Sequence, residues 1–215
     1  MSDIVIKKLD AFFSKYPVRE YKKGDVIIQA GEEPEGIYYI REGNVRSYWI
    51  SEEGSEITLN MYKPHIFIPM SWAIAGIENT HYYEAMNDVK LSLAPKDVFL
   101  DFLKNEPEII YDLLKRIYVG MHGLWTHLES LAAGNSYMKL INSLVILARR
   151  FGKEEKLTMT IQLKMNERNI SNYAGMSRET ASRELQKLKK NNLVSFQKGI
   201  FIIKDIHKLE NMLLH

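Results

Sequence analysis

A regular apolar seam in the middle of the chain constrains its fold more than any other feature. Seven apolar residues after Pro107 follow one another at alternating spacings of four and three: Ile110, Leu114, Ile117, Met121, Leu124, Leu128 and Leu131. This is the a/d pattern of a long helix, whose narrow stripe packs best against a second helix. The pattern predicts a dimerisation helix over residues 107–133. Packing of the stripe on the chain's own preceding domain is the alternative.

Short runs rich in Val, Ile, Tyr and Phe precede this helix. They cover residues 26–28, 37–40, 45–50, 57–62 and 89–93, and glycine-containing turns separate most of them. Short strands at roughly 8–12-residue spacing are typical of an antiparallel barrel or sandwich. We therefore expect residues 1–106 to form an antiparallel β-roll, or jelly roll.

The residues after the seam predict a third part, over residues 136–215. A helix is expected over residues 136–151, followed by a charged junction over residues 153–156. Next come a helix, a tight turn at Gly175 and a second helix capped by Ser177. The inward-facing residues of these two helices are expected to be Ile170, Ala174, Ala181, Leu185 and Leu188. A hairpin over residues 193–203 would complete a winged helix-turn-helix, which makes the chain an α+β protein.

Positive charge gathers in this last part. Residues 149–215 hold 14 Lys and Arg against 7 Asp and Glu, whereas residues 1–148 hold 15 against 20. Contact with phosphates requires clustered Lys and Arg, so the asymmetry favours nucleic-acid binding over a merely solvated surface.

The second helix of the helix-turn-helix presents side chains that can read base edges. At about 100° per residue, Glu179, Ser182 and Arg183 share a face, and Arg178 lies at its edge. Arg can bind guanine O6 and N7, and Glu can accept from cytosine N4. Lysines such as Lys187 and Lys198 suit phosphates. The predicted DNA contacts are Ser177, Arg178, Glu179, Thr180, Ser182, Arg183, Lys187 and Lys198. A surface helix with intrahelical charge pairs is the alternative.

These motifs together resemble a known family. Residues 23–27 (KGDVI), 31–32 (GE), 37–40 (IYYI) and 42–45 (EGNV) resemble the β-roll of the cyclic-nucleotide-binding superfamily. Residues 175–183 (GMSRETASR) resemble the recognition segment of the CRP/FNR transcription regulators. The resemblance implies that residues 1–106 are a sensor domain. It also implies a homodimer that binds a palindromic promoter site in double-stranded DNA and recruits or obstructs RNA polymerase. A cytoplasmic location is expected because the N-terminal residues include acidic side chains and form no apolar signal segment. It leaves TGTGA-type and TTGAT-type half-sites both open.

The resemblance fails at the effector site. Family members that bind cyclic AMP hold it on a Gly-Glu segment and on an Arg-Ser or Arg-Thr pair. An ungapped alignment places Ile68-Pro69 and Asn79-Thr80 at those positions. Pro69 offers neither a carboxylate nor a backbone N–H, and Asn79 lacks the charge of Arg. We therefore expect that cyclic AMP does not bind in the family's usual manner.

The same segment is aromatic and apolar, and two interpretations stay open. Its side chains either fill the roll or line a pocket for an unidentified, less charged small-molecule effector. The candidate pocket residues are Ile68, Met70, Trp72, Thr80, Tyr82 and Tyr83. His65 and His81 could ligate a haem iron, but lone histidines in β domains more often make hydrogen bonds, so haem is not expected.

Other classes of protein find less support. The sequence shows no catalytic motif such as HExxH, a Walker loop or GxGxxG, so we do not expect an enzyme. It has no cysteine, which excludes cysteine-ligated metal centres, and no metal site is expected. The longest uncharged stretch has 14 residues, too few to cross a membrane. A ligand-binding co-regulator that contacts proteins rather than DNA remains the alternative function.

Overall fold

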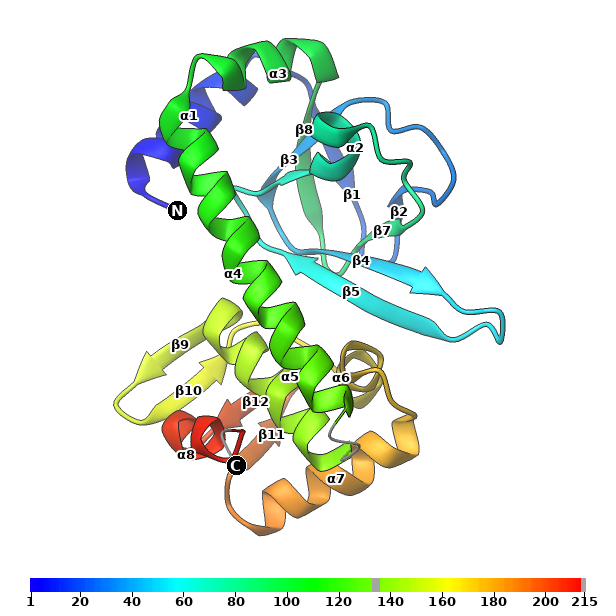
Figure 1. The fold of residues 1–215 in the computed structure, drawn as a ribbon, viewed down its shortest axis with the longest axis vertical. Coiled ribbons are helices and arrows are strands. Elements are labelled where there is room, and N and C mark those ends of the chain that lie inside the picture. The colour runs from blue at the N-terminus through cyan, green and yellow to red at the C-terminus, as the bar shows by residue number, and fades with distance from the viewer. Residues whose placement is uncertain (133–135, 214–215) are drawn as a thin grey trace. The chain divides into compact units, whose positions relative to one another are not determined.

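The computed structural model describes residues 1–132 and 136–213, without the side chains of residues 126, 127 and 129–132. The chain forms two compact units, Met1–Ile117 and Tyr118–His215, and each is described by itself. Both units combine helices with antiparallel sheets, which confirms the predicted α+β class (Figure 1).

The first unit contains two four-stranded antiparallel sheets and short flanking helices. The sheets have the strand orders β1-β8-β3-β6 and β2-β7-β4-β5. The elements are α1 (Asp3–Phe13), β1 (Val18–Tyr21), β2 (Val26–Ile28), β3 (Ile37–Glu42), β4 (Val45–Ile50), β5 (Glu56–Tyr62), β6 (Phe67–Ile68), α2 (Met70–Ala75), β7 (Tyr82–Ala85), β8 (Val89–Ala94), α3 (Lys96–Lys104) and the first part of α4 (Pro107–Ala132). All five predicted strands are present, and β1, β6 and β7 were not predicted.

Strand β3 shows how the first unit builds two cores. Its residues Ile37 to Ile40 are all at most 2% exposed. Successive side chains of a strand point to opposite faces, so Ile37 and Tyr39 join one cluster and Tyr38 and Ile40 join the other. The Ile37 cluster lies under α1 and α3, and the Tyr38 cluster fills the space between the two sheets. A strand covered on both faces reads as a continuous apolar run, as here.

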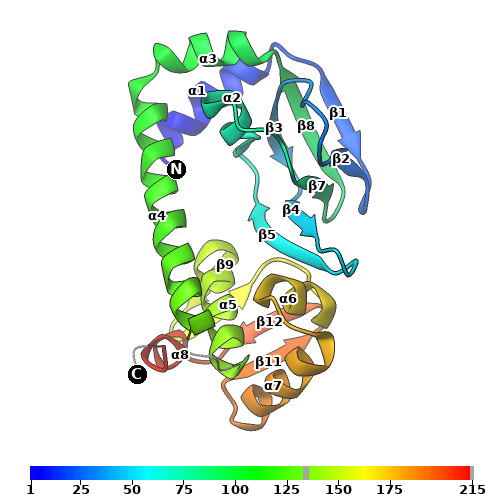
Figure 2. The same cartoon turned by 45° about the vertical axis from the view of Figure 1, so that its right-hand side comes forward.

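Aromatic side chains hold α1 and α3 on the first cluster. The rings of Phe12 on α1 and Phe102 on α3 stack at 4.2 Å, and Phe13 stacks on Tyr39 of β3 at 4.5 Å. The two helices lie side by side in Figures 1 and 2. The sequence analysis predicted neither helix, because segments of 11 and 9 residues carry little periodicity.

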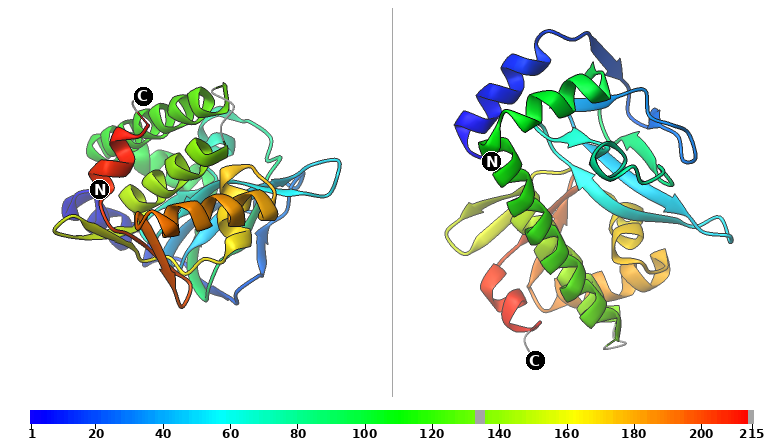
Figure 3. Two further views of the ribbon diagram at one scale, coloured as in Figure 1. Left: turned by 90° about the horizontal axis from the view of Figure 1, so that it is seen from below. Right: turned by 45° about the horizontal axis from the view of Figure 1, so that its top comes forward.

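Helix α4 has 26 residues. The right panel of Figure 3 shows it as one unbroken helix. Its start at Pro107 agrees with the predicted start, because proline is tolerated in the first helical turn. The predicted end at residue 133 lies outside the described residues.

The second unit contains the last part of α4, a helical group and a four-stranded sheet of order β11-β12-β10-β9. Its further elements are α5 (Ser136–Phe151), β9 (Gly152–Glu155), β10 (Thr158–Ile161), α6 (Glu167–Ala174), α7 (Arg178–Lys190), β11 (Val194–Gln197), β12 (Ile200–Ile203) and α8 (Ile206–Asn211). The prediction of a charged junction over residues 153–156 was wrong, because residues 152–155 form strand β9 in register with β10. Exposed charged side chains on an edge strand account for the misleading pattern.

The helix-turn-helix of this unit agrees with the predicted pattern. Helices α6 and α7 pack on α5 (Figure 2). The five residues expected to face inward are each 0% exposed: Ile170, Ala174, Ala181, Leu185 and Leu188. Gly175 ends α6 in the left-handed conformation, with φ of 61°, which a glycine adopts without steric cost.

Candidate nucleic-acid interface

The start of helix α7 is fixed by a side-chain cap. Ser177 has an extended backbone, and its Oγ accepts a hydrogen bond of 3.2 Å from the backbone N–H of Thr180. Such caps satisfy an otherwise free N–H of the first turn and stabilise the helix by about 1 kcal/mol. The Thr180 hydroxyl lies 3.1 Å from the same Oγ, so the two predicted contacts Ser177 and Thr180 both belong to the cap.

The exposed face of α7 gathers polar side chains around a shallow surface hollow. Its lining residues are Glu167, Arg178, Glu179, Ser182, Arg183 and Gln186. The structure thus brings together all four residues that were predicted to face base edges.

Two residues of the hollow were missed by the sequence analysis. Gln186 follows Ser182 by four residues and Glu179 by seven, so the helical period could have found it. A glutamine side chain can make two hydrogen bonds to adenine. Glu167 comes from α6, and only the packing of the two helices places it beside α7.

The exposed face of α7 carries both a charged hydrogen-bond acceptor and a charged hydrogen-bond donor. Hydrogen bonds from its own backbone N–H and from the Ser177 hydroxyl hold the pKa of Glu179 below its usual value. Glu179 is therefore an ionised acceptor in the first turn of α7. The side chain of Arg183 is 65% exposed and carries five N–H donors. An acceptor and a forked donor one turn apart can engage a C·G or G·C pair.

The hairpin of β11 and β12 ends in a basic tip. Lys198 and Gly199 connect the strands with φ of 50° and 82°, and the flanking Gln197 and Ile200 are paired. Positive φ at both central residues is the feature of the type I′ turn that matches the twist of a two-residue hairpin. Lys198 is exposed there, as a phosphate contact requires. Lys187, the other predicted phosphate contact, lies with its Nζ 2.6 Å from Glu184.

The apolar seam of α4 is exposed. In the first unit, Ile110, Leu114 and Ile117 are 44–48% exposed, so the sheets of that unit leave them uncovered. Met121, Leu124 and Leu128 are exposed as well. The seventh predicted residue, Leu131, lies in the helix, but its side chain is outside the described part of the chain.

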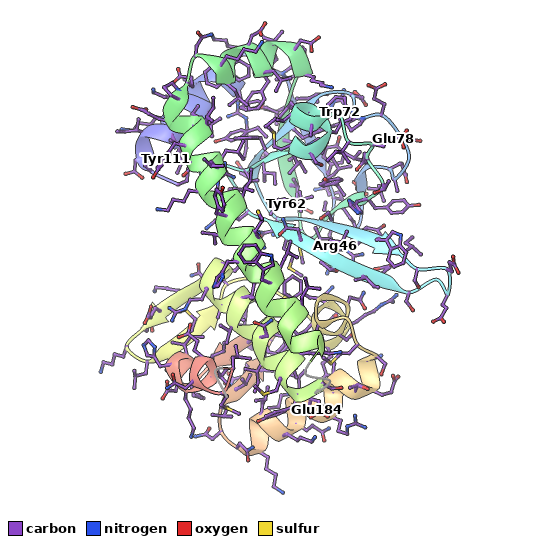
Figure 4. The ribbon with its side chains drawn as sticks, in the orientation of Figure 1. Arg46, Tyr62, Trp72, Glu78, Tyr111 and Glu184 are labelled. Carbon is purple, nitrogen blue, oxygen red and sulfur yellow. The ribbon has the colours of Figure 1, made fainter. Side chains whose placement is uncertain are left out.

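The candidate effector residues belong to different packing clusters of the first unit. Ile68 and Tyr83 belong to the cluster between the sheets, whereas Trp72 belongs to the cluster under α1 and α3, against which Met70 packs. Figure 4 labels Trp72, whose ring lies 4.3 Å from the Lys96 Nζ.

The remaining two candidates lie apart from these clusters. Tyr82 stacks on Tyr48 at 5.1 Å, and Thr80 is exposed. The six residues therefore contribute to separate surroundings in the first unit.

Asn79 is committed to a structural role. Its side-chain N–H donates to the Gln29 carbonyl at 2.8 Å, its Oδ1 accepts from the His81 backbone N–H at 3.4 Å, and its own carbonyl accepts from Gly31 N–H at 2.7 Å. Asn79 is only 7% exposed, and its hydrogen bonds connect the loop at residues 79–81 with the loop at residues 29–31. These bonds use the amide groups that could otherwise approach a ligand at this position.

The two histidines considered for haem have protein partners. The Nδ1 of His65 lies 2.9 Å from the hydroxyl of Tyr39, which donates to Asp10 Oδ1 at 2.7 Å. The Nε2 of His81 lies 3.5 Å from Thr80 Oγ1, and burial lowers the pKa of His81. Among the described residues, no group of three or more His, Asp or Glu could hold a metal ion.

No helix in the described part of the chain is long and apolar enough to span a membrane.

Comparison with protein families matches both parts of the chain. Residues 18–106 match the model of the cyclic nucleotide-binding domain, and residues 138–212 match the model of the Crp-like helix-turn-helix domain. Among curated proteins, the fumarate and nitrate reduction regulatory protein of Yersinia pestis is 26% identical over 84% of this chain and 72% of its own length. The global nitrogen regulator of a Nostoc species is 26% identical over 84% of this chain and 82% of its own length.

Solved structures show the same fold. A CRP/FNR-family transcriptional regulator from Thermus thermophilus superposes with a TM-score of 0.71 at 24% identity, over 93% of this chain and 99% of that one. A CooA mutant from Carboxydothermus hydrogenoformans superposes with a TM-score of 0.78 at 19% identity, over 94% of this chain and 90% of that one.

Proposed function

Because this chain belongs to the CRP/FNR family of DNA-binding transcription regulators, which are not enzymes, we propose that it binds a palindromic promoter site as a homodimer. We further propose that it does so without using cyclic AMP in the family's usual manner. The observation that carries this proposal is the exposed polar face of α7, with its ionised Glu179 and its forked Arg183.

Different residues of this surface would contact the bases and the phosphates, which supports sequence-specific binding. Arg178, Glu179, Ser182 and Arg183 gather at one hollow, where a helix in the major groove would meet base edges. Lys187 and Lys198 supply phosphate contacts, which add affinity without sequence information. The half-site is of TGTGA or TTGAT type.

Dimerisation follows from the exposed seam of α4. A stripe with a/d spacing and roughly half of its apolar surface exposed is stabilised by a second copy of the same helix. Two copies would present two α7 helices, and a two-fold symmetric protein requires a palindromic site with half-sites about 34–36 Å apart.

Pro69 and Asn79 support the proposal that this protein does not bind cyclic AMP in the family's usual manner. Pro69 has no N–H to donate, and the side chain of Asn79 already bonds Gln29 and His81. Thr80 alone cannot replace the charge of the missing Arg. An effector of other chemistry is compatible with this arrangement, and so is a regulator without one. RNA polymerase is the partner that the bound dimer would recruit or obstruct.

Selection of binding sites from random duplex DNA tests the proposal. The full chain is purified without added ligand and compared with Arg183→Ala and with Lys208→Ala, which removes one positive charge from α8. We expect a palindrome with a TTG or TGTGA core for the wild type and Lys208→Ala, and loss of that core for Arg183→Ala. Enrichment of a single half-site would contradict the homodimer. Binding at low salt without any sequence enrichment would contradict sequence-specific recognition.

A further inference from the structure

A buried carboxylate lies in the middle of the recognition helix. Glu184 is 3% exposed, although both Arg183 before it and Lys187 after it have side chains that are more than half exposed. Figure 4 labels it on α7. Glutamate is rarely buried unless it is paired, so its surroundings require an explanation.

Glu184 is paired with two of the predicted DNA contacts. Its Oε1 accepts a hydrogen bond of 3.2 Å from Arg183 Nε, and its Oε2 lies 2.6 Å from Lys187 Nζ. Lys187 and Arg183 together hold the pKa of this carboxyl below its usual value, so it is ionised. The two ion pairs offset the cost of burying the charge, although Oε2 has the lysine as an ion-pair partner only and accepts no hydrogen bond from the residues that the structure describes.

The bond to Arg183 uses the inner part of the guanidinium only. Nε is the donor, and the two terminal nitrogens carry four further N–H groups. Those terminal groups form the fork that binds guanine O6 and N7. A carboxylate fixed in the helix surface can therefore hold the arginine by its Nε and leave the fork free.

We infer that Glu184 is a positioning residue that orients Arg183 before DNA binding and thereby sets the discrimination for guanine, rather than the overall affinity. This inference rests on the proposed DNA-binding function. Without Glu184, the long Arg183 side chain must be ordered at the moment of binding, and ordering one such side chain reduces binding about two- to tenfold.

A competing role predicts the opposite sign. If Glu184 only competes with DNA phosphates for Arg183 and Lys187, its neutralisation strengthens binding to every sequence alike. Discrimination between bases would then stay constant, which makes the two roles separable by one substitution.

The test uses the full chain and the palindrome obtained by selection. The guanine that Arg183 contacts is identified first: its replacement weakens binding of the wild type but not of Arg183→Ala. This guanine is then changed to 7-deazaguanine, which removes the N7 acceptor. The ratio of the two dissociation constants is measured for the wild type and for Glu184→Gln. Glu155→Gln is the matched control, because Glu155 is also ion-paired with a lysine, Lys153 at 2.9 Å, but lies on β9 and does not line the hollow.

We expect the 7-deazaguanine ratio to fall about two- to tenfold in Glu184→Gln and to stay unchanged in Glu155→Gln. Affinity for unrelated DNA should stay the same or rise in both variants, because each loses a negative charge. An unchanged ratio in a folded Glu184→Gln protein, or equal strengthening on all sequences, would overturn the inference.

A measurement on the free protein separates this inference from the proposed function. The Arg183 Nε–H signal in the nitrogen NMR spectrum of the wild type is expected to exchange slowly with water, because a buried carboxylate accepts from it. Rapid exchange in the wild type would overturn the inference whether or not DNA binds and whether or not Glu184→Gln folds.

Discussion

Shortening of Leu124 tests the seam of α4 most directly. Leu124 is 60% exposed in the single chain and occupies a d position of the heptad pattern. In a two-fold symmetric dimer it meets its partner helix along the seam, so a single substitution removes two contacts from each dimer.

The expected effect can be worked from the exposed fraction. Leu124→Ala removes three carbon atoms, and each buried carbon of this kind contributes about 0.8 kcal/mol. If the partner covers the 60% that is exposed, the loss is about 1.4 kcal/mol for each copy and about 3 kcal/mol for each dimer. The dissociation constant of the dimer should therefore rise about 100-fold.

Sedimentation equilibrium over a range of protein concentrations measures this constant. Val119→Ala is the matched control, because Val119 is 66% exposed on the same helix but lies at position f, away from the seam. Its dissociation constant should match that of the wild type. Equal weakening by both substitutions, or none by Leu124→Ala, would refute the assignment of the seam as the dimer interface.

Four further predictions concern DNA binding, the effector region and stability. Lys198→Ala should lower the salt slope of DNA binding by about 0.9 for each subunit without altering the preferred sequence, as measured by fluorescence anisotropy; a changed preference would contradict a phosphate contact. Calorimetry should show no tight cyclic AMP binding, and tight binding that Thr80→Ala abolishes would contradict the proposed effector behaviour. Asn79→Ala should lower the free energy of unfolding by about 1–3 kcal/mol in urea, because it removes the two hydrogen bonds of a buried side chain; a loss below about 0.5 kcal/mol would contradict the structural role of Asn79. The ion pair with Arg149 lowers the pKa of Glu210 below its usual value of 4.5, so its stabilising effect is present above that pH and is lost as the pH falls through the lowered pKa. Urea unfolding should therefore show a shallower loss of stability on acidification for Glu210→Gln than for the wild type, and parallel curves would exclude the effect.

Local patterns were sufficient to predict the second unit in detail. Helix α5 covers Ser136–Phe151, as predicted, and the cap at Ser177 and the turn at Gly175 are where the sequence places them. These features are a helix cap, a left-handed glycine and the helical spacing of buried residues. Each depends on residues no more than four positions apart. The helical period also predicts that the four residues on the exposed face of α7 lie together.

The first unit was predicted less completely because its missing elements depend on distant partners. Strand β6 has two residues and is held by Tyr38 and Tyr39 of β3, and β7 is held between β2 and β4. A segment of two to four residues carries too little periodicity to show its structure without these partners. The candidate effector residues likewise belong to different packing clusters, although they are near one another in the sequence.

Glu184 and Asn79 show where the sequence stops being informative about the site. Glu184 follows the buried Ala181 by three residues and precedes the buried Leu185, so the helical period places it at the margin of the inward face. Composition nevertheless favours a surface position for a glutamate, and only the side-chain positions of Arg183 and Lys187 decide between the two. Asn79 is similar, because its amide bonds a backbone carbonyl 50 residues away. In both cases a polar group is buried because specific partners satisfy it, and those partners are fixed by packing rather than by spacing. Polar residues that are buried next to a predicted site are therefore the ones whose roles most require the structure.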